Sequence, residues 1–374
     1  MTDLFICSGE MSGDLHGAKL IEALLNLRPD LKIGAVAGPH MRKWPIREYF
    51  PMESLKVMGF LDVLKALPQL IRTFYQIRNQ ILALNPKAVL FIDYPGFHLR
   101  LENSLRKKGF QGKLIHFICP SVWAWGKKRI FPMAKNLDLL LTLFPFEKGY
   151  FSNTNLKVKY VGHPLAKQIA PPIPCKEKIL ALFPGSRKAQ IDRNLPLQLK
   201  VARRLKEANP ELQIALSQAG FPLSQAGFPP LAQAGFPPDI AGVKIVKMED
   251  RYELMRSCHM AIATSGTVTL ELALHGVPTV VSYAIRPFDQ FLAQKIFRID
   301  LPFYSLPNIV ADEEVYKELF GSNLTEESLF FWTQKLLLDP SLRQRAILGC
   351  QKVQKNLGTQ DAALEAAQAI LLAF

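Results

Sequence analysis

Asp93 is the acidic side chain best placed in the sequence to act as a base. It follows the apolar run Ala88–Ile92 and precedes the turn-forming residues Tyr94–Gly96. A short apolar run followed by such a turn predicts a buried strand, and ligands of open α/β sheets bind beyond the carboxyl ends of strands. Burial would raise the pKa of this lone carboxyl, which suits a general base. The alternative is that Asp93 only caps the next helix.

The turn Pro184–Arg187 (PGSR) has the composition of a phosphate-binding loop. It follows the apolar run Ile179–Phe183. Gly185 frees the backbone, and Arg187 offers a planar fork to phosphate oxygens. The alternative is a capped turn with a solvated arginine.

A second candidate anion site lies at Thr264, Ser265, Gly266 and Thr267, which open the predicted helix Val268–His275. Small residues at a helix N-terminus expose main-chain N–H groups to an anion. Glu271 lies one turn further along and could accept two sugar hydroxyls. The alternative is an ordinary helix cap with Glu271 on the surface.

The first loop, Ser8–Asp14 (SGEMSGD), also follows an apolar run and opens a helix. Its glycines allow close approach of the backbone to a ligand or to the sheet, and Glu10, Ser12 and Asp14 supply polar groups. The spacing is not that of the GxGxxG dinucleotide fingerprint. Capping of the helix by Ser12 or Asp14 is the alternative.

Two other groups of residues carry weaker signals. The run Pro120–Trp125 (PSVWAW), followed by Lys127–Arg129, could bind an anionic and greasy molecule, although paired tryptophans more often pack internally. The histidines show no metal-ligand spacing, so we assign each a structural role and predict no metal site and no cofactor. These histidines are at positions 16, 40, 98, 116, 163, 259 and 275.

The elements that must position these residues alternate between strand and helix. In the first half we predict strands at Leu4–Ser8, Ile33–Ala37, Ala88–Ile92, Leu114–Ile118, Leu139–Leu143 and Val158–Val161. In the second half we predict strands at Ile179–Phe183, Gln213–Leu216, Lys244–Val246, Met260–Ala263 and Thr279–Ser282. Amphipathic helical stretches lie between them, and Glu326–Phe374 is mostly helical. Two such series predict an α/β protein of two doubly wound parallel-sheet domains, separated at the proline-rich segment Ala170–Pro174.

The composition is that of a folded protein with a substantial core. The chain has 374 residues, of which 49% are hydrophobic and 21% charged, and this balance excludes a disordered chain. Its longest apolar run, Leu137–Phe146, is too short to cross a membrane. The five cysteines are scattered, which fits a reducing cytoplasm.

The positive charge is concentrated in the first half. The net charge is +14. Residues 1–165 carry 23 Lys and Arg against 12 Asp and Glu, whereas the remainder carries 23 against 20. This excess favours an anionic partner, such as a phosphorylated substrate or an anionic membrane surface.

The segment Ser217–Pro238 contains three near-copies of a unit with the core QAGFP. Its prolines exclude a long helix, and three short copies are too few for a solenoid. We interpret the segment as a surface loop that grew by duplication, with a partner-binding loop as the alternative.

Several motifs together resemble the lipid-A-disaccharide synthase family in order and spacing. They are SGEMSGDLHGA (8–18), VMGFLDVL (57–64), FIDYPGF (91–97), PSVWAW (120–125), FPFEK (144–148), VGHP (161–164), FPGSR (183–187), TSGTVTLE (264–271) and SLPN (305–308). The resemblance implies a GT-B fold, in which two Rossmann-like domains face a cleft. Residues 1–170 would bind the acceptor and residues 171–355 the UDP-sugar, while residues 356–374 would form a helix that packs back across the first domain.

The implied reaction is an inverting, metal-free transfer. UDP-2,3-diacylglucosamine would react with 2,3-diacylglucosamine 1-phosphate (lipid X) to give lipid A disaccharide phosphate and UDP. By motif position the family's proposed base matches Asp93, with Glu10 and Asp14 as further catalytic candidates. The substrate-binding candidates are Ser12, Arg187, Ser265, Gly266, Thr267, Glu271 and Asn308. The chain has Gly96 where many relatives carry a second aspartate.

Two other functions are alternatives: a different GT-B enzyme and a nucleic-acid-binding protein. Another GT-B enzyme, resembling the lipid II glycosyltransferase or a UDP-sugar 2-epimerase, would lack PSVWAW together with SGDLHGA. A nucleic-acid-binding protein would show clustered basic residues, whereas here the charges are dispersed and the densest run is Lys127–Arg129. We therefore predict no nucleic-acid partner.

The predicted helix at 61–84 is the candidate membrane contact. Its apolar residues recur at spacings of three and four, so they share one face, and Lys65, Arg72 and Arg78 lie off that face. The alternative is that this stripe packs on the sheet. We expect a cytoplasmic protein peripherally attached to the anionic inner membrane of a Gram-negative-type bacterium, with the oligomeric state open and a homodimer as one option. The proposed contact residues are Leu61, Leu64, Leu67, Leu70 and Ile71.

Overall fold

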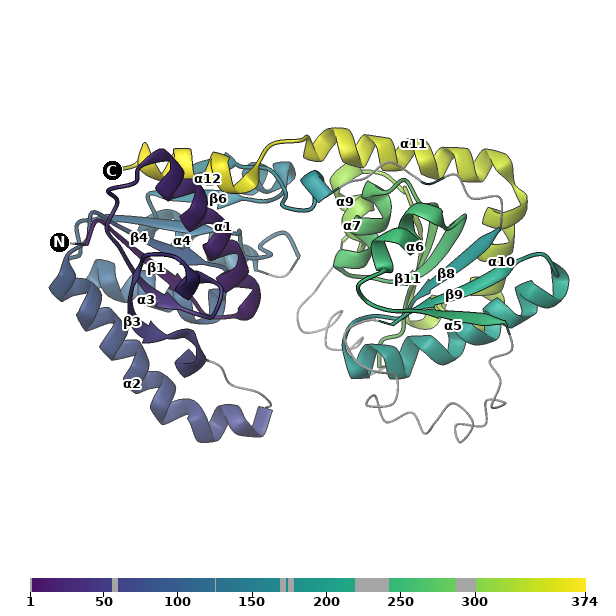
Figure 1. The fold of residues 1–374 in the computed structure, drawn as a ribbon, viewed down its shortest axis with the longest axis horizontal. Coiled ribbons are helices and arrows are strands. Elements are labelled where there is room, and N and C mark those ends of the chain that lie inside the picture. The colour runs from purple at the N-terminus through teal and green to yellow at the C-terminus, as the bar shows by residue number, and fades with distance from the viewer. Residues whose placement is uncertain are drawn as a thin grey trace. The chain divides into compact units, whose positions relative to one another are not determined.

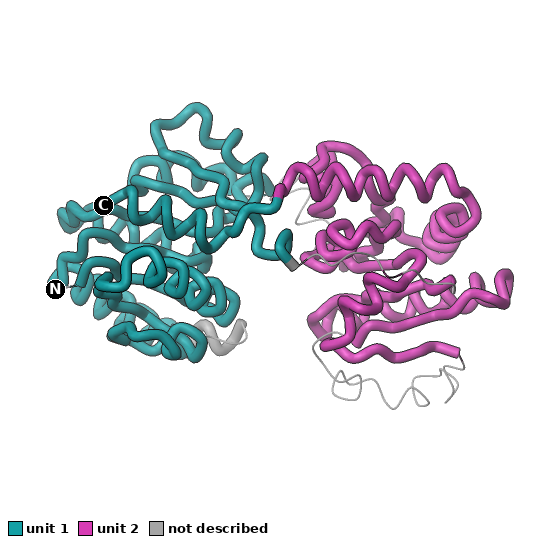
Figure 2. The backbone as a smooth tube through the Cα atoms, turned by 45° about the horizontal axis from the view of Figure 1, so that its top comes forward, with its two compact units in different colours: residues 1–167, 359–374 teal, residues 168–358 magenta. Residues whose placement is uncertain are grey.

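The chain forms two compact units, each built on a parallel sheet. The computed structural model describes residues 2–55, 60–124, 126–168, 173, 178–218, 242–286 and 301–374, except for the side chains of 60–66 and 168. Unit 1 comprises residues 1–167 and 359–374, and unit 2 comprises residues 168–358 (Figure 2). Trp125 and the repeated segment from residue 219 onward lie outside the described residues.

Unit 1 contains a seven-stranded sheet in the order β3-β2-β1-β4-β5-β6-β7, and every strand pairing in it is parallel. Its strands are β1 (Leu4–Ser8), β2 (Ile33–Ala37), β3 (Arg47–Pro51), β4 (Ala88–Ile92), β5 (Lys113–Phe117), β6 (Leu139–Thr142) and β7 (Lys157–Tyr160). Its helices are α1 (Met11–Leu27), α2 (Phe60–Leu84), α3 (Pro95–Lys107), α4 (Ile130–Asn136) and α12 (Ala362–Leu371). Short 3₁₀ turns include η1 (Met41–Lys43) and η4 (Pro145–Phe151).

Helices cover both faces of this sheet (Figure 1). On one face, Leu20 and Leu24 of α1 and Ile370 of α12 join the apolar residues of the strands in one core. On the other face, Ile77 of α2 and Leu101 of α3 complete a second core, together with Met133 of α4. The last helix therefore belongs to the core of unit 1 and not to unit 2, which precedes it in the chain.

Unit 2 repeats the same design with a six-stranded sheet in the order β10-β9-β8-β11-β12-β13. Its strands are β8 (Ile179–Phe183), β9 (Gln213–Ser217), β10 (Val243–Val246), β11 (Met260–Thr264), β12 (Thr279–Tyr283) and β13 (Lys317–Phe320). Its helices are α5 (Lys188–Ala208), α6 (Arg251–Ser257), α7 (Thr267–Leu274), α9 (Leu306–Ala311), α10 (Glu326–Leu338) and α11 (Pro340–Leu357). Leucines of α5 and α10 share one core, and α6 and α7 contribute to another.

The predicted alternation of strands and helices is confirmed, but two strands were missed. β3 (REYFP) and β13 (KELF) both lie at an edge of their sheet. Their side chains are largely half-buried or exposed, so neither strand has the continuous apolar run of a strand buried on both faces. The pattern on which the strand predictions relied is absent from such edge strands.

Both sheets have a topological switch point. The first strand of each unit pairs on one side with the second strand and on the other side with the fourth, so β1 adjoins β4 and β8 adjoins β11. Loops that leave neighbouring strands in opposite directions open a crevice at their carboxyl ends, where ligands of this fold class bind. The candidate residues near Ser8, Asp93, Arg187 and Ser265 follow these four strands.

Candidate active site

In unit 1, the loops after β1 and β4 contact each other at the switch point. Asp93 and Tyr94 both have a positive φ of 49°, a conformation that costs free energy in residues other than glycine and recurs at functional sites. A Cβ atom at Gly9 would overlap the Tyr94 ring, so glycine is required there. The Tyr94 hydroxyl donates to the carbonyl of Leu55 at 3.1 Å. The strained turn is therefore held by packing on both sides.

Asp93 is half-buried at the end of β4. Burial raises the pKa of its carboxyl group, and the nearby His116 opposes this effect. Its main-chain N–H donates to the carbonyl of Phe117 at 2.9 Å, and its own carbonyl accepts a hydrogen bond from Nδ1 of His98 at 2.7 Å. The main chain of Asp93 is thus fixed while its carboxyl remains partly accessible, as a general base requires.

Beneath Asp93 lies a buried polar cluster that the sequence analysis did not identify. It consists of His98 and Glu102 of α3 and His116 of β5, and all three are fully buried. Nδ1 of His116 lies 2.6 Å from Oε1 of Glu102. One signal was available in the sequence, because His98 and Glu102 are four residues apart and therefore lie on the same side of α3. Nothing in the sequence indicated that His116 would join them.

The three polar residues of the first loop lie in different environments. Glu10 and Ser12 are exposed at the start of α1, whereas Asp14 is fully buried. The Asp14 carboxylate accepts main-chain hydrogen bonds from Gly38 at 2.8 Å, His40 at 2.7 Å and Met41 at 3.2 Å. These bonds fix the segment between β2 and η1. A catalytic role for Asp14 would require its carboxylate to give up these partners.

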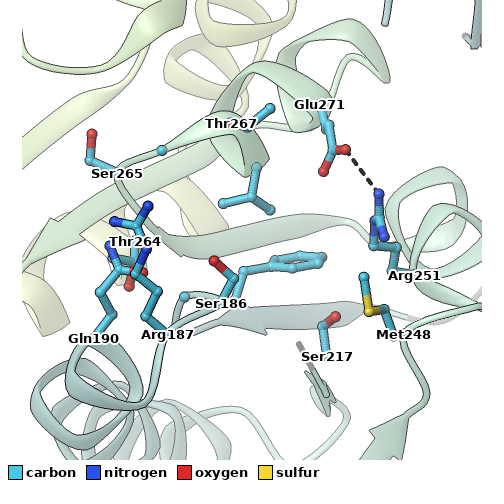
Figure 3. Close-up of a pocket in the computed structure, with 14 residues that line it drawn as sticks. Ser186, Arg187, Gln190, Ser217, Met248, Arg251, Thr264, Ser265, Thr267 and Glu271 are labelled. Carbon is cyan, nitrogen blue, oxygen red and sulfur yellow. Dashed lines mark hydrogen bonds and ion pairs between the residues drawn. The ribbon is translucent and has the colours of Figure 1, made fainter. Parts of the chain in front are cut away.

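Unit 2 has a cavity of about 310 Å³ at its switch point (Figure 3). It is formed by the loops after β8 and β11, with further residues from β9, α6 and α7. The predicted PGSR turn and TSGT turn meet there. The lining residues are Phe183, Gly185, Ser186, Arg187, Gln190, Ser217, Met248, Arg251, Thr264, Ser265, Gly266, Thr267, Val268 and Glu271.

The two turns bring a cation and a helix N-terminus into this cavity. Gly185 has a φ of +116°, and a Cβ atom there would lie 2.8 Å from Cβ of Gln190. Arg187 is exposed at the N-cap position of α5. Opposite it, Gly266 is the N-cap of α7, whose first main-chain N–H groups have no partners within the helix. Such an arrangement can neutralise a phosphate group without a metal ion.

Glu271 is buried and not a surface acid. Its Oε1 accepts hydrogen bonds from Arg251 at 3.1 Å and from the Tyr252 hydroxyl at 2.8 Å, and Figure 3 shows the contact with Arg251. The side chain is therefore oriented from α6 before any ligand binds. Its other carboxylate oxygen is the atom that could accept a sugar hydroxyl.

Asn308 lies outside the lining of this cavity. It is fully buried at the start of α9. Its Oδ1 accepts hydrogen bonds from the main-chain N–H groups of Val315 and Tyr316, and its Nδ2 donates to the Tyr316 carbonyl and to Glu318. The amide thus uses both donors and both acceptor positions inside the protein. Direct contact with a substrate would require these bonds to exchange.

Sequence comparison decides the family. The family model described as lipid-A-disaccharide synthetase matches residues 4–373. The chain belongs to the lipid-A-disaccharide synthetase family.

Relatives within this family span a range of lengths. The chain is 41% identical over 334 residues to the lipid-A-disaccharide synthase of Chlamydia pneumoniae, a match that covers 86% of this chain and 54% of that protein. It is 32% identical over 374 residues to the lipid-A-disaccharide synthase of Geobacter sulfurreducens, covering 95% of this chain and 93% of that protein. The chain thus spans about half the length of its chlamydial relatives and nearly all of the Geobacter protein.

Solved structures identify the fold as GT-B. The UDP-GlcNAc 2-epimerase from Neisseria meningitidis, bound to UDP-GlcNAc, aligns over 100% of both chains with a TM-score of 0.62 and 12% identity. The glycotransferase of kitacinnamycin aligns over 100% of this chain and 99% of its own, with a TM-score of 0.59 and 14% identity. At such low identity these similarities establish the architecture alone.

In this member of the synthetase family, α2 presents an apolar stripe to solvent. The side chains of Leu67 and Ile71 are 45% and 47% exposed, whereas Leu70 packs against the core of unit 1. The side chains of Leu61 and Leu64 lie outside the described residues. The predicted stripe is therefore divided between solvent and core over its described part.

The described residues bring together no group of three or more His, Cys, Asp or Glu side chains suited to holding a metal ion. Within the same part of the chain, every helix falls short of the length and apolarity that a membrane crossing needs.

Proposed function

We propose that this chain transfers a diacylated glucosamine from UDP to a second diacylated glucosamine that carries a 1-phosphate. The products are the lipid A disaccharide 1-phosphate and UDP. The observation that carries the proposal is the family match, which runs through both units from residue 4 to residue 373. The arrangement of side chains at the two switch points supports it, because one offers a base and the other an anion site.

In this proposal unit 2 binds the UDP-sugar. The cavity of about 310 Å³ would receive the diphosphate between Arg187 and the N-terminus of α7. Glu271, held by Arg251 and Tyr252, would accept hydroxyl groups. As the glycosidic bond breaks, the departing diphosphate gains negative charge, and a fixed cation together with main-chain N–H groups stabilises that charge in the transition state.

Unit 1 binds the acceptor and supplies the base. The 6-hydroxyl of the acceptor loses its proton to Asp93 as its oxygen attacks the anomeric carbon, and the configuration at that carbon inverts. Glu10 and Ser12 are exposed at the start of α1, beyond the carboxyl end of β1, and would contact the acceptor. Asp14 and Asn308 have roles in holding main-chain segments, since their hydrogen-bonding capacity is engaged inside the protein.

The direct test is product analysis. Purified protein is incubated with UDP-2,3-diacylglucosamine and the 1-phosphate acceptor, and products are identified by mass spectrometry with a coupled assay for UDP. Equal amounts of disaccharide phosphate and UDP are expected, with UDP release lost when the acceptor is omitted. Epimerised sugar nucleotide without disaccharide would instead support an epimerase, and EDTA abolishing turnover would contradict the metal-free mechanism.

We also propose that the exposed part of α2 contacts an anionic membrane. Leu67 and Ile71 are exposed on α2 with Arg72 beside them, and apolar insertion and attraction to lipid phosphates reinforce each other. The double variant Leu67→Ser with Ile71→Ser should reduce sedimentation with phosphatidylglycerol vesicles and keep the melting temperature within a few degrees.

Leu70→Ser is the matched control for this experiment. Leu70 lies on the same helix but packs against the core, so its substitution should lower thermal stability and leave vesicle binding of the folded protein unchanged. Unchanged vesicle binding in the Leu67/Ile71 variant would remove α2 from the membrane contact.

A further inference from the structure

The buried polar cluster of unit 1 contacts the turn that carries Asp93. In the parallel register of β4 and β5, Phe91 is the partner of His116, and the centres of their stacked rings are 6.5 Å apart. The centre of the His98 ring lies 6.4 Å from that of His116, and Nδ1 of His98 donates to the Asp93 carbonyl at 2.7 Å. The cluster therefore places a carboxylate–imidazole pair next to the turn of the proposed base.

The pair of Glu102 and His116 is tightly enclosed. Their side chains are 1% and 0% exposed, and the contact between Oε1 and Nδ1 is 2.6 Å. The other polar atom of each side chain, Oε2 of Glu102 and Nε2 of His116, has no hydrogen-bond partner within the described residues. Buried polar atoms without partners lower stability, and an electrostatic effect of the pair on the neighbouring Asp93 carboxyl group would account for this cost.

We propose that His116 and Glu102 are positioning residues that keep Asp93 ionised and ready to accept a proton. This inference rests on the proposed function, in which Asp93 is the base. The Glu102 carboxylate lies 2.6 Å from Nδ1 of His116 and so favours positive charge on that ring, and positive charge near a buried carboxylate favours its ionised form. Burial alone acts in the opposite direction, because it raises the pKa of the Asp93 carboxyl group.

The other titratable groups around Asp93 do not supply this charge. Burial lowers the pKa of His98 to about 3, so His98 is neutral at working pH and serves to hold the Asp93 carbonyl. Burial also raises the pKa of Cys7 on β1 and that of Tyr94, so both remain neutral. Glu10, at the start of α1, has an acidic side chain and therefore cannot supply a positive charge. Among the described groups, His116 is the one whose charge lowers the pKa of Asp93.

The test is the pH dependence of kcat/KM, which reports the pKa of the base in the free enzyme. In His116→Asn the acid limb should move to higher pH by about one unit, so activity at low pH falls about tenfold and recovers as the pH rises. Glu102→Gln, which preserves shape, should move the limb in the same direction. The double variant should resemble His116→Asn alone, because both substitutions remove one shared effect.

His98→Asn is the matched control. It disturbs the same buried cluster and the Asp93 main chain but removes no charge, so it should lower stability or kcat without moving the acid limb. UDP affinity, which depends on unit 2, should stay at the wild-type value in all variants. An acid limb that stays in place or moves to lower pH in folded Glu102→Gln and His116→Asn proteins overturns the inference.

A measurement on the unmodified protein guards against variants that fail to fold. In isotope-labelled wild type, the ring ¹⁵N shifts of His116 should report an imidazolium across the pH range in which activity develops, and a neutral ring there also overturns the inference. If the wild type forms no disaccharide at any pH, the proposed function itself fails. If it does form disaccharide with an unaltered acid limb in the variants, only the role of the pair fails.

Discussion

The switch point of unit 1 and that of unit 2 have the same topology but opposite environments. In unit 1 the carboxyl group of Asp93 stands above fully buried His98, Glu102 and His116. In unit 2 the equivalent loops enclose an open cavity with an exposed Arg187 and a helix N-terminus. A low-dielectric surrounding shifts the pKa of a proton acceptor, whereas an open basic site binds a diphosphate. The same strand order thus presents a half-buried carboxyl group in one unit and an open basic cavity in the other, according to what lies behind the loops.

The strongest test of this comparison is Asp93→Asn. If the unit 1 site supplies the base, kcat should fall by about 10²–10⁴, the usual contribution of a general base, with UDP affinity by calorimetry near the wild-type value. Near-normal turnover would move the base to Glu10, the exposed acid of the first loop.

Arg187→Ala tests the opposite half of the comparison. A charge-assisted contact with phosphate serves both the ground state and the transition state, so UDP affinity and turnover should each fall, affinity by about 10- to 100-fold. Lys188→Ala is the control, because Lys188 is the next residue but forms an ion pair with Asp192. Equal effects of the two substitutions would show that the cavity responds to net charge and not to Arg187.

Asp14→Asn separates a structural carboxylate from a catalytic one in unit 1. The amide can no longer accept all three main-chain hydrogen bonds, so the protein should lose about 1–3 kcal/mol of stability and melt several degrees lower, while kcat of the folded protein changes little. A hundredfold loss of kcat at an unchanged melting temperature would make Asp14 part of the reaction.

The smallest effect is expected for Glu147, which tests whether the interior of unit 1 has a low dielectric constant. It lies in η4, and burial raises its pKa to about 8. Because the pKa of Glu147 is higher in the folded state than in the unfolded state, protonation of Glu147 stabilises the folded protein. This stabilisation is complete at pH values below the unfolded-state pKa and is lost as the pH rises through about 8. Thermal melting of the wild type should therefore fall between pH 5 and pH 9 by a few degrees more than melting of Glu147→Gln. Parallel curves would place Glu147 in a polar environment.

The sequence by itself determined the repeated architecture and the positions of the loops that carry the candidate site residues. Central strands such as Ala88–Ile92 and Ile179–Phe183 are buried on both faces, so each appears as an uninterrupted apolar run. The loop at the carboxyl end of a parallel strand is then fixed by the strand itself. For this reason the sequence alone places Asp93, Arg187 and Ser265 at the carboxyl ends of central strands, and the motifs around them indicate the family.

Only the tertiary structure decided what each polar side chain contacts. Asp14 and Asn308 resemble ligand-binding residues in the sequence, yet both form hydrogen bonds inside the protein. Asp14 accepts from main-chain groups 24 or more residues away. Asn308 bonds to the segment Val315–Glu318. His116 gave no signal, because its partner Glu102 comes from a different element. Local sequence encodes strand and helix through periodicity, whereas hydrogen bonds between elements depend on how the elements pack against one another.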